Sequence, residues 1–178
     1  MARIFQRRCY TQGQYDGKFR EYFYFINHEG MLFLEDSRMK NFTSAYKGIR
    51  RIFLNFFYKK LRFNETKRFE EFPYISHCGR ERNYLKCDDR PIVYTQLSED
   101  RKSLRVGQSD IFHEFQPSRL FMKESGRLYH PAPFADFALL RDKLGDQLHP
   151  RFEFDAHGFP VKFRHWNGHL VELERVRK

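Results

Sequence analysis

The sequence has few cysteines and no long apolar segment. Its apolar runs fall far short of the ~20 residues that a membrane-spanning helix needs. No short apolar core of a secretory signal lies near the start either. Three cysteines in 178 residues are too few for a disulfide framework. We therefore expect a soluble protein without a membrane span, which folds in a reducing compartment and keeps Cys78 and Cys87 as free thiols.

Several motifs with known chemistry are also missing. The strings G-x-G-x-x-G, G-x-x-x-x-G-K-S/T, H-E-x-x-H and G-x-S-x-G do not occur, so phosphate loops, zinc proteases and serine hydrolases lack their usual support. The cysteines form no C-x-x-C pair, and a zinc site would lack its remaining ligands. The sequence therefore predicts no metal site and identifies no cofactor.

Aromatic residues and positive charge are abundant instead. The chain contains 21 Phe and 10 Tyr, and its formal net charge is +10. Large aromatic side chains usually bury much of their area, so we expect most of them in the core. The positive charge suits an anionic partner, although it is spread along the chain. The aromatic residues have the spacing of core residues, so they are not expected to stack on bases. Nucleic acid is therefore a disfavoured partner, although it is not excluded.

The segment 1–15 differs in composition from the rest of the chain. It contains three arginines and no acidic residue before Asp16. A basic, acid-free start is typical of a mitochondrial presequence, and Arg8 stands two residues before Tyr10, as at a matrix-processing site. We predict a presequence over 1–15 and a location in the mitochondrial matrix. A frayed basic terminus is the alternative.

The hydrophobic pattern predicts more strands than helices. Residues 19–34 have the pattern of an aromatic hairpin, with a turn at 27–30 and apolar side chains on both faces. Further strands are predicted at 69–75, 83–87, 92–97, 104–106, 111–115, 127–129, 152–154, 161–166 and 169–174.

Two segments have helical patterns. Apolar residues at steps of three and four predict a core helix over 42–61, with Ile52 and Phe56 on its buried face. A second helix is predicted over 136–148. The predicted fold class is α+β, a mostly antiparallel sheet built from hairpins with one long core helix and a second C-terminal helix. Residues 16–178 are predicted to form a single domain, and two subdomains, if present, meet near 98–110.

His165 and His169 resemble a pair of metal ligands four residues apart. A two-residue turn at Asn167-Gly168 is a strong hairpin signal, and it would pair His165 with Leu170. Because successive side chains of a strand alternate between faces, the two imidazoles would then point to opposite faces. This register predicts no metal site at the pair.

The stretch 76–92 is the richest in reactive and charged groups. It holds His77 and Cys78, followed by four cations and three carboxylates, which are Arg80, Arg82, Lys86, Arg90, Glu81, Asp88 and Asp89. One interpretation is structural. In that interpretation the cations form salt bridges with the carboxylates and brace the loop against the neighbouring strands.

The function that we predict is a binding or accessory module. Its charged loop at 77–91 would hold an anionic small molecule or a protein partner, because cations attract anionic groups. The residues expected to line this site are Arg80, Arg82, Asn83, Asp88, Asp89 and Arg90.

The alternative function is a cysteine-dependent redox enzyme, such as a thiol peroxidase. Cys78 would be the reactive thiol, since His77 and Arg80 are neighbours that can lower the pKa of a thiol. Cys87 would then act as the resolving thiol.

The distance between the two thiols depends on the strand register. A turn at Gly79 would pair Cys87 near Phe72, too far from Cys78 for a disulfide, whose Cα atoms lie within ~7 Å. A turn at 82–83 would instead bring the two cysteines together.

Several uncommon strings resemble an uncharacterised animal family whose human member is named only as an open reading frame on chromosome 8. They are R-E-Y-F-Y-F-I at 20–26, K-N-F at 40–42, C-G-R-E-R-N at 78–83, C-D-D-R-P at 87–91 and G-R-L-Y-H-P at 126–131. The similarity covers residues 20–133, and the chain looks like an invertebrate member. The resemblance implies a mitochondrial location and supplies no activity.

A fainter similarity leads to a bacterial family of unknown function. That family has repeated α/β motifs, and a ligand-binding or signalling role has been proposed for it. Its acidic-Asp-x-Pro-aromatic string would correspond here to residues 88–92, although Ile92 is not aromatic.

Overall fold

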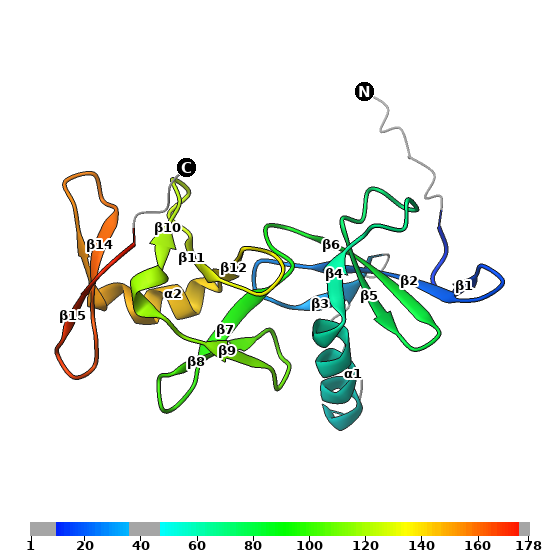
Figure 1. Ribbon diagram of the computed structural model, residues 1–178, viewed down its shortest axis with the longest axis horizontal. Coiled ribbons are helices and arrows are strands. Elements are labelled where there is room, and N and C mark those ends of the chain that lie inside the picture. The colour runs from blue at the N-terminus through cyan, green and yellow to red at the C-terminus, as the bar shows by residue number, and fades with distance from the viewer. Residues whose placement is uncertain (1–9, 36–46, 175–178) are drawn as a thin grey trace.

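The chain folds into three β-sheets that lie in a row. The computed structural model describes residues 10–35 and 47–174, with side chains described from Arg51 in the segment that begins at Lys47. These residues form fifteen strands, two α-helices and two short 3-10 helices, η2 (Pro117–Arg119) and η3 (His149–Arg151). Figure 1 shows the third sheet at one end, the second in the middle and the first at the other end. The predicted α+β class is therefore wrong, because the protein is mostly β.

The first sheet has six strands in the order β1-β2-β6-β5-β4, with β3 also paired to β2. Its strands are β1 (Gln14–Tyr15), β2 (Arg20–Ile26), β3 (Leu32–Leu34), β4 (Leu61–Phe63), β5 (Tyr74–Cys78) and β6 (Glu81–Cys87). The predicted hairpin at 19–34 is confirmed, since β2 and β3 pair antiparallel around the turn. The central pair β2 and β6 is parallel.

The alternating aromatic residues of β2 build a core on each face of the first sheet. Phe23 packs with Phe72, Ile75 and Tyr84 in a small aromatic cluster on one face. Tyr24 and its same-face neighbours join the main core, which continues into the second sheet. Both faces are thus covered, as the hairpin pattern predicts.

Helix α1 (Lys47–Lys59) covers the main-core face of the first sheet. Leu54, Phe57 and Tyr58 are buried, whereas Ile52 is 60% and Phe56 58% exposed. The predicted buried face is wrong for those two residues. The predicted helix residues 42–46 lie outside the described part of the chain, and the described helix of 13 residues is not the long core helix expected. No helix that the structure describes has both the length and the apolarity to cross a membrane.

The second sheet follows a short linker, residues 88–92. Its order is β10-β11-β12-β7-β8-β9, with a parallel pair between β12 and β7. Its strands are β7 (Val93–Leu97), β8 (Ser103–Val106), β9 (Phe112–Glu114), β10 (Phe121–Met122), β11 (Leu128–Pro131) and β12 (Phe137–Leu140). The chain changes sheets at 88–92, whereas residues 98–110 lie within the β7-β8-β9 region of the second sheet.

The second predicted helix is wrong in its first half. Residues 137–140 form strand β12, and α2 covers only Asp142–Leu148. Ala138, Leu139 and Leu140 are all buried, because β12 lies inside the sheet between β11 and β7. A short apolar run of this kind cannot be assigned to a helix or a buried strand from periodicity alone.

The third sheet consists of β13 (Phe152–Phe154), β14 (Pro160–Arg164) and β15 (Leu170–Glu172). Arg164 pairs with Leu170, and the backbone N–H of His165 donates to the carbonyl of His169 at 2.8 Å. The loop is therefore one residue longer than predicted, and His165 stands opposite His169 rather than Leu170. The predicted register is wrong. Among the described residues, no third ligand lies close enough to these histidines to complete a metal cluster.

Candidate functional site

The predicted loop at 77–91 is a tight hairpin followed by the linker to the second sheet. Cys78 pairs with Glu81, so the turn consists of Gly79 and Arg80, and Gly79 has a φ of +62°. A left-handed backbone favours glycine at that position. The register follows the Gly79 alternative, and Cys78 and Cys87 are free thiols.

The surroundings of Cys78 do not activate its thiol. Burial raises the thiol pKa above its ordinary value, with smaller opposing effects from neighbours that include the Ser76 hydroxyl. The Sγ atom lies 3.5 Å from that hydroxyl. His77, the next residue along β5, has its side chain on the opposite face of the strand. Burial also raises the pKa of Cys87, to about 12. The redox alternative therefore lacks a stabilised thiolate.

Arg82 and Asn83 have structural partners. Arg82 donates to Asp16 at 2.9 Å and lies 3.9 Å from Glu21, a fully buried carboxylate. Asn83, also fully buried, donates from Nδ2 to the carbonyl of Ser76 at 3.1 Å. These interactions fasten β6 to the rest of the first sheet.

Asp88 and Asp89 connect the linker to elements on both sides of it. Asp88 accepts a hydrogen bond from the backbone N–H of His28 at 3.1 Å, in the β2-β3 turn. Asp89 accepts hydrogen bonds from Arg127 at 3.0 Å and from the Tyr129 hydroxyl at 2.7 Å, both near or on β11. Strings 87–91 and 126–131, far apart in the sequence, thus meet in space.

The salt bridges predicted between cations and carboxylates of the loop are mostly replaced by contacts with residues outside it. Arg90 lies 3.9 Å from Asp89, the one ion pair inside the loop among the described residues. Its guanidinium also stacks over the Phe137 ring, with 3.6 Å between the guanidinium carbon and the ring centroid. Lys86 lies over the Phe72 ring at 4.2 Å. These contacts agree with the structural interpretation of the loop. Most of them connect the loop to other elements and not to its own residues.

Arg80 is the predicted ligand residue that lines a cavity of its own. This cavity, of about 500 Å³, is also lined by Cys78, Lys18 and Arg20. All three of its cations are exposed. Water and salt screen exposed charges strongly, so this group is a weak basis for an anion site.

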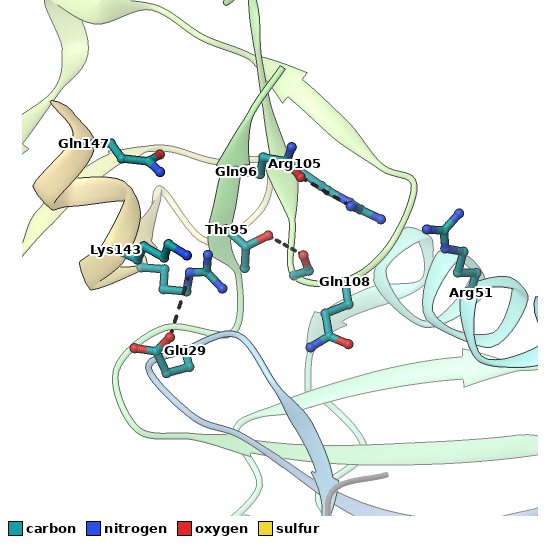
Figure 2. Close-up of a pocket in the computed structure, with 10 residues that line it drawn as sticks. Glu29, Arg51, Thr95, Gln96, Arg105, Gln108, Lys143 and Gln147 are labelled. Atoms are coloured by element: carbon teal, nitrogen blue, oxygen red, sulfur yellow. Dashed lines mark hydrogen bonds and ion pairs between the residues drawn. The ribbon is translucent and has the colours of Figure 1, made fainter. Parts of the chain in front are cut away.

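A larger cleft of about 790 Å³ opens where the first and second sheets meet. Figure 2 shows its lining residues, which come from the β2-β3 turn, α1, β7, β8 and α2. Four of them are cations, namely Arg51, Arg105, Arg141 and Lys143. One lining residue, Glu29, is acidic.

Two glycines let the elements around the cleft approach closely. A Cβ at Gly107 would lie 2.6 Å from the Tyr58 hydroxyl and 3.3 Å from the carbonyl of Gly30. A Cβ at Gly30 would lie 2.9 Å from Cγ2 of Thr95. The Thr95 hydroxyl in turn donates to the carbonyl of Gly107. The β2-β3 turn, α1 and the β8-β9 turn are therefore in direct contact at the base of the cleft.

Arg51 and Arg105 form one end of the cleft. Both pair with Asp110, at 3.8 Å and 3.6 Å. Arg105 also donates from Nε to the carbonyl of Ser109 at 2.6 Å, which fixes its direction. Two guanidinium groups share one carboxylate, so this end keeps positive charge.

Arg141 and Lys143 form the other end, where α2 begins. The backbone N–H of Arg141 donates to the carbonyl of Tyr94 at 2.9 Å, which anchors the residue on β7. Its Nε atom lies 3.9 Å from a Glu29 oxygen, and it is buried without a hydrogen-bond partner. Lys143 has no ion pair among the residues that the structure describes.

One group of side chains near this end has the composition of a metal site. His28, Glu29 and Asp142 offer ligand atoms within 4.8 Å of one another. Arg141 competes for the Glu29 carboxylate, and His28 already contacts Asp88 at 3.2 Å. We therefore assign Glu29 and His28 to these two contacts rather than to a metal.

None of the cleft cations was among the predicted site residues. They are single arginines and lysines in separate segments of the sequence. Nothing in the sequence around them distinguishes them from other charged residues on the surface. The general excess of positive charge was the sequence signal available, and it gives no position.

Comparison with known families gives a decisive match. The family model of DUF4505, a domain of unknown function, matches residues 12–177. The chain belongs to the DUF4505 family. The part of the chain that matches DUF4505 contains both the cleft residues and the loop 77–91. The expectation of a family without an established function is confirmed, whereas its animal and mitochondrial details stay predictions.

Two solved bacterial structures are similar to this DUF4505 chain. A DUF1285 family protein from Silicibacter pomeroyi DSS-3 has 15% sequence identity and a TM-score of 0.49, with 92% of this chain and 91% of that chain covered. A DUF1285 family protein from Shewanella baltica OS155 has 13% identity and a TM-score of 0.45, with 73% and 92% covered. Neither likeness enters the argument about function.

Proposed function

We propose that this protein is a binding module that holds a small anionic ligand in the cleft between the first and second sheets. The observation that carries the proposal is the convergence of four cations from α1, β8 and the start of α2 on one cavity. These elements are distant in sequence, and the tertiary fold brings their charges together. Clustered cations in a concave site attract anions by electrostatic focusing.

The burial of two of these cations strengthens the argument. The side chain of Arg105 is 21% exposed and that of Arg141 is 29% exposed. Charges withdrawn from water interact more strongly with a bound anion than exposed ones do.

The proposal keeps the predicted class of ligand and moves its site. Of the residues predicted from the loop, Arg82, Asp88 and Asp89 are engaged in ion pairs and hydrogen bonds. In this proposal Arg82 stabilises the first sheet, and Asp88 and Asp89 fix the linker to the β2-β3 turn and to β11, next to the cleft.

Isothermal titration calorimetry with pyrophosphate tests the proposal. We expect binding by the wild type, and we expect at least one of Arg51→Gln and Lys143→Gln, at the two ends of the cleft, to weaken it roughly tenfold through the loss of one charge-assisted contact. Lys102→Gln is the control, because it removes a positive charge from an exposed turn outside the cleft. Absence of binding, or a failure of both cleft substitutions to weaken binding more than Lys102→Gln does, would contradict the proposal.

We also propose a mitochondrial location, as the basic segment and the resemblance to an animal family imply. Strand β1 pairs with β2, and Tyr10 stacks on Phe23 at 4.1 Å. A removable leader would therefore end before β1. A fluorescent protein fused to residues 1–15 should enter mitochondria, and cytosolic fluorescence would rule this out.

A further inference from the structure

The cleft has a cationic group at each end rather than one central group. Figure 2 shows Lys143 and Glu29 on one side and Arg51 on the other, with Thr95 and Arg105 between them. We infer that the ligand is a small polyol with an anionic group at each end, as in a bisphosphorylated sugar. This inference rests on the proposed function and specifies its ligand.

Two cations line the cleft at each end. Arg51 and Arg105 share Asp110 at one end. At the other end Arg141 and Lys143 line the cleft with Glu29, and the Asp142 carboxylate lies within 4.8 Å of that of Glu29 without lining the cleft. A ligand with one anionic group would leave one of these ends without an added partner.

The lining between the two ends is polar. Thr95, Gly107 and the amides of Gln96 and Gln108 contribute to it together with Arg105, and a third amide, Gln147, lies on α2 on the Lys143 side. An amide both donates and accepts hydrogen bonds, so it suits hydroxyl groups. Amides and a threonine therefore match a chain of hydroxyls between the anionic groups.

The lining also excludes two common classes of anion. Among the residues whose side chains the structure describes, no aromatic and no large aliphatic side chain lines the cleft. A nucleotide base would lack a ring on which to stack. An acyl chain would lack an apolar surface to contact. Sugar phosphates need neither.

A ligand that reaches both ends would also connect the two sheets. Arg51 belongs to α1, which packs on the first sheet, whereas Arg105 and Arg141 belong to or pack on the second. The ligand would therefore stabilise the arrangement of the sheets as well as fill the cleft, and stabilisation by a ligand follows its affinity for the folded state.

Calorimetry at constant ionic strength separates a two-ended site from a one-ended site. The probes are pyrophosphate, a hexose monophosphate and a hexose bisphosphate with its phosphates at opposite ends. We expect the bisphosphate to bind at least roughly tenfold more tightly than the monophosphate or pyrophosphate, because it alone contacts both ends. Pyrophosphate controls for total charge.

Substitutions at each end complete the test. Arg51→Gln and Lys143→Gln should each weaken the bisphosphate roughly tenfold, whereas only one of them should weaken the monophosphate. Lys102→Gln should change neither affinity. Arg51 is 58% exposed, so its substitution is compatible with folding, which a melting curve checks.

The outcomes distinguish this inference from the proposed function. Equal affinities for pyrophosphate and the bisphosphate, with one end insensitive to substitution, would overturn the two-ended ligand and leave the anion cleft intact. Equal affinities for the hexose bisphosphate and hexanediol bisphosphate, which has no hydroxyls between its phosphates, would overturn the polyol. Failure of every probe to bind would overturn both.

Discussion

At the scale of the residue, Cys78 shows that the direction of a side chain matters more than its neighbours in sequence. His77 and Arg80 flank it, and their proximity suggested an activated thiol. In a strand, however, adjacent side chains point to opposite faces. Cys78 faces the half-buried surroundings of Ser76, where burial raises its pKa. His77 and Arg80 could lower the pKa of the thiol only if the backbone placed their side chains on the same face as Cys78.

This pKa direction predicts slow alkylation of Cys78. At neutral pH a raised pKa lowers the thiolate fraction, so iodoacetamide should modify Cys78 several-fold more slowly than it modifies glutathione. Cys87, whose pKa is raised to about 12, should be slower still. Mass spectrometry of the two peptides over time gives both rates. A rate for Cys78 above that of glutathione would restore the redox alternative.

His130 is a second residue whose chemistry depends on burial. The residue is 2% exposed, and its Nε2 atom accepts a hydrogen bond from the backbone N–H of Gln116 at 3.0 Å. An Nε2 that accepts must be unprotonated, so Nδ1 carries the proton and donates to the carbonyl of Pro131 at 2.9 Å. Burial is the largest cause of its pKa falling to about 4.

The lowered pKa of His130 predicts a loss of stability in mild acid. Between the folded pKa of about 4 and the ordinary value of 6.5, the unfolded state binds a proton that the folded state does not. Stability is therefore complete above the ordinary value and falls as the pH decreases through this window. From about pH 7 to about pH 5 we expect a loss of about 2 kcal/mol from this group.

Urea unfolding at the two pH values measures this loss. His130→Gln serves as the comparison, because an amide can accept from Gln116 and donate to Pro131 without titrating. The variant should lose about 2 kcal/mol less than the wild type over the same interval. Equal losses in the two proteins would show that His130 is not the titrating group.

At the scale of the element, the main error concerned short apolar segments. Residues 137–140 have a pattern that suits a helix or a buried strand, and the parallel pairing of β12 with β7 decides between them. That pairing joins segments about forty residues apart, which no local pattern contains. Hairpins such as 19–34 were predictable, since their strands are adjacent and their turn has its own signature.

The turn after β8 is an element whose position depends on one glycine. Gly107 has a φ of +51°, and a side chain there would meet the buried Tyr58 hydroxyl. Gly107→Ala should therefore cost about 2–3 kcal/mol in unfolding free energy, from backbone strain and overpacking together. Urea unfolding gives the value.

Gly126→Ala is the matched control for this turn. Gly126 has a φ of +78°, but a Cβ there would meet nothing within 4 Å, so only the backbone cost of about 1 kcal/mol applies. Tyr58→Phe should restore part of the loss in the Gly107→Ala protein, because it removes the nearest atom. Equal costs at both glycines would show that the contact with α1 is unimportant.

At the scale of the whole molecule, the linker 88–92 holds the first and second sheets together. Asp89 is 17% exposed and binds both Arg127 and the buried Tyr129 hydroxyl. Asp89→Ala would leave that hydroxyl without its acceptor, and we expect a loss of about 2 kcal/mol. The adjacent Asp88 is 39% exposed, and Asp88→Ala should cost less than about 1 kcal/mol.

Urea unfolding of the two variants compares neighbouring carboxylates of equal charge. A larger loss for Asp89→Ala supports the linker contact with β11 as the stronger brace. A larger loss for Asp88→Ala would instead place the main brace at the β2-β3 turn. Loss of pyrophosphate affinity in the Asp89→Ala protein, with folding retained, would further connect the brace to the cleft.

The sequence by itself determined the features that depend on local spacing. These are the 19–34 hairpin, the turn at Gly79 as one of two alternative positions, the free thiols and the aromatic core. The α+β class, the exposed face of α1 and the longer 165–169 loop were not determined, because each depends on what packs against the segment.

Only the tertiary structure decided where the cations gather. Arg51, Arg105, Arg141 and Lys143 carry no shared motif, and a charge acquires a field only from its distance to other charges and to water. Local spacing sets which residues share a strand or a helix face. The meeting of two sheets sets which charges share a cleft, and for this protein that decides the proposed function.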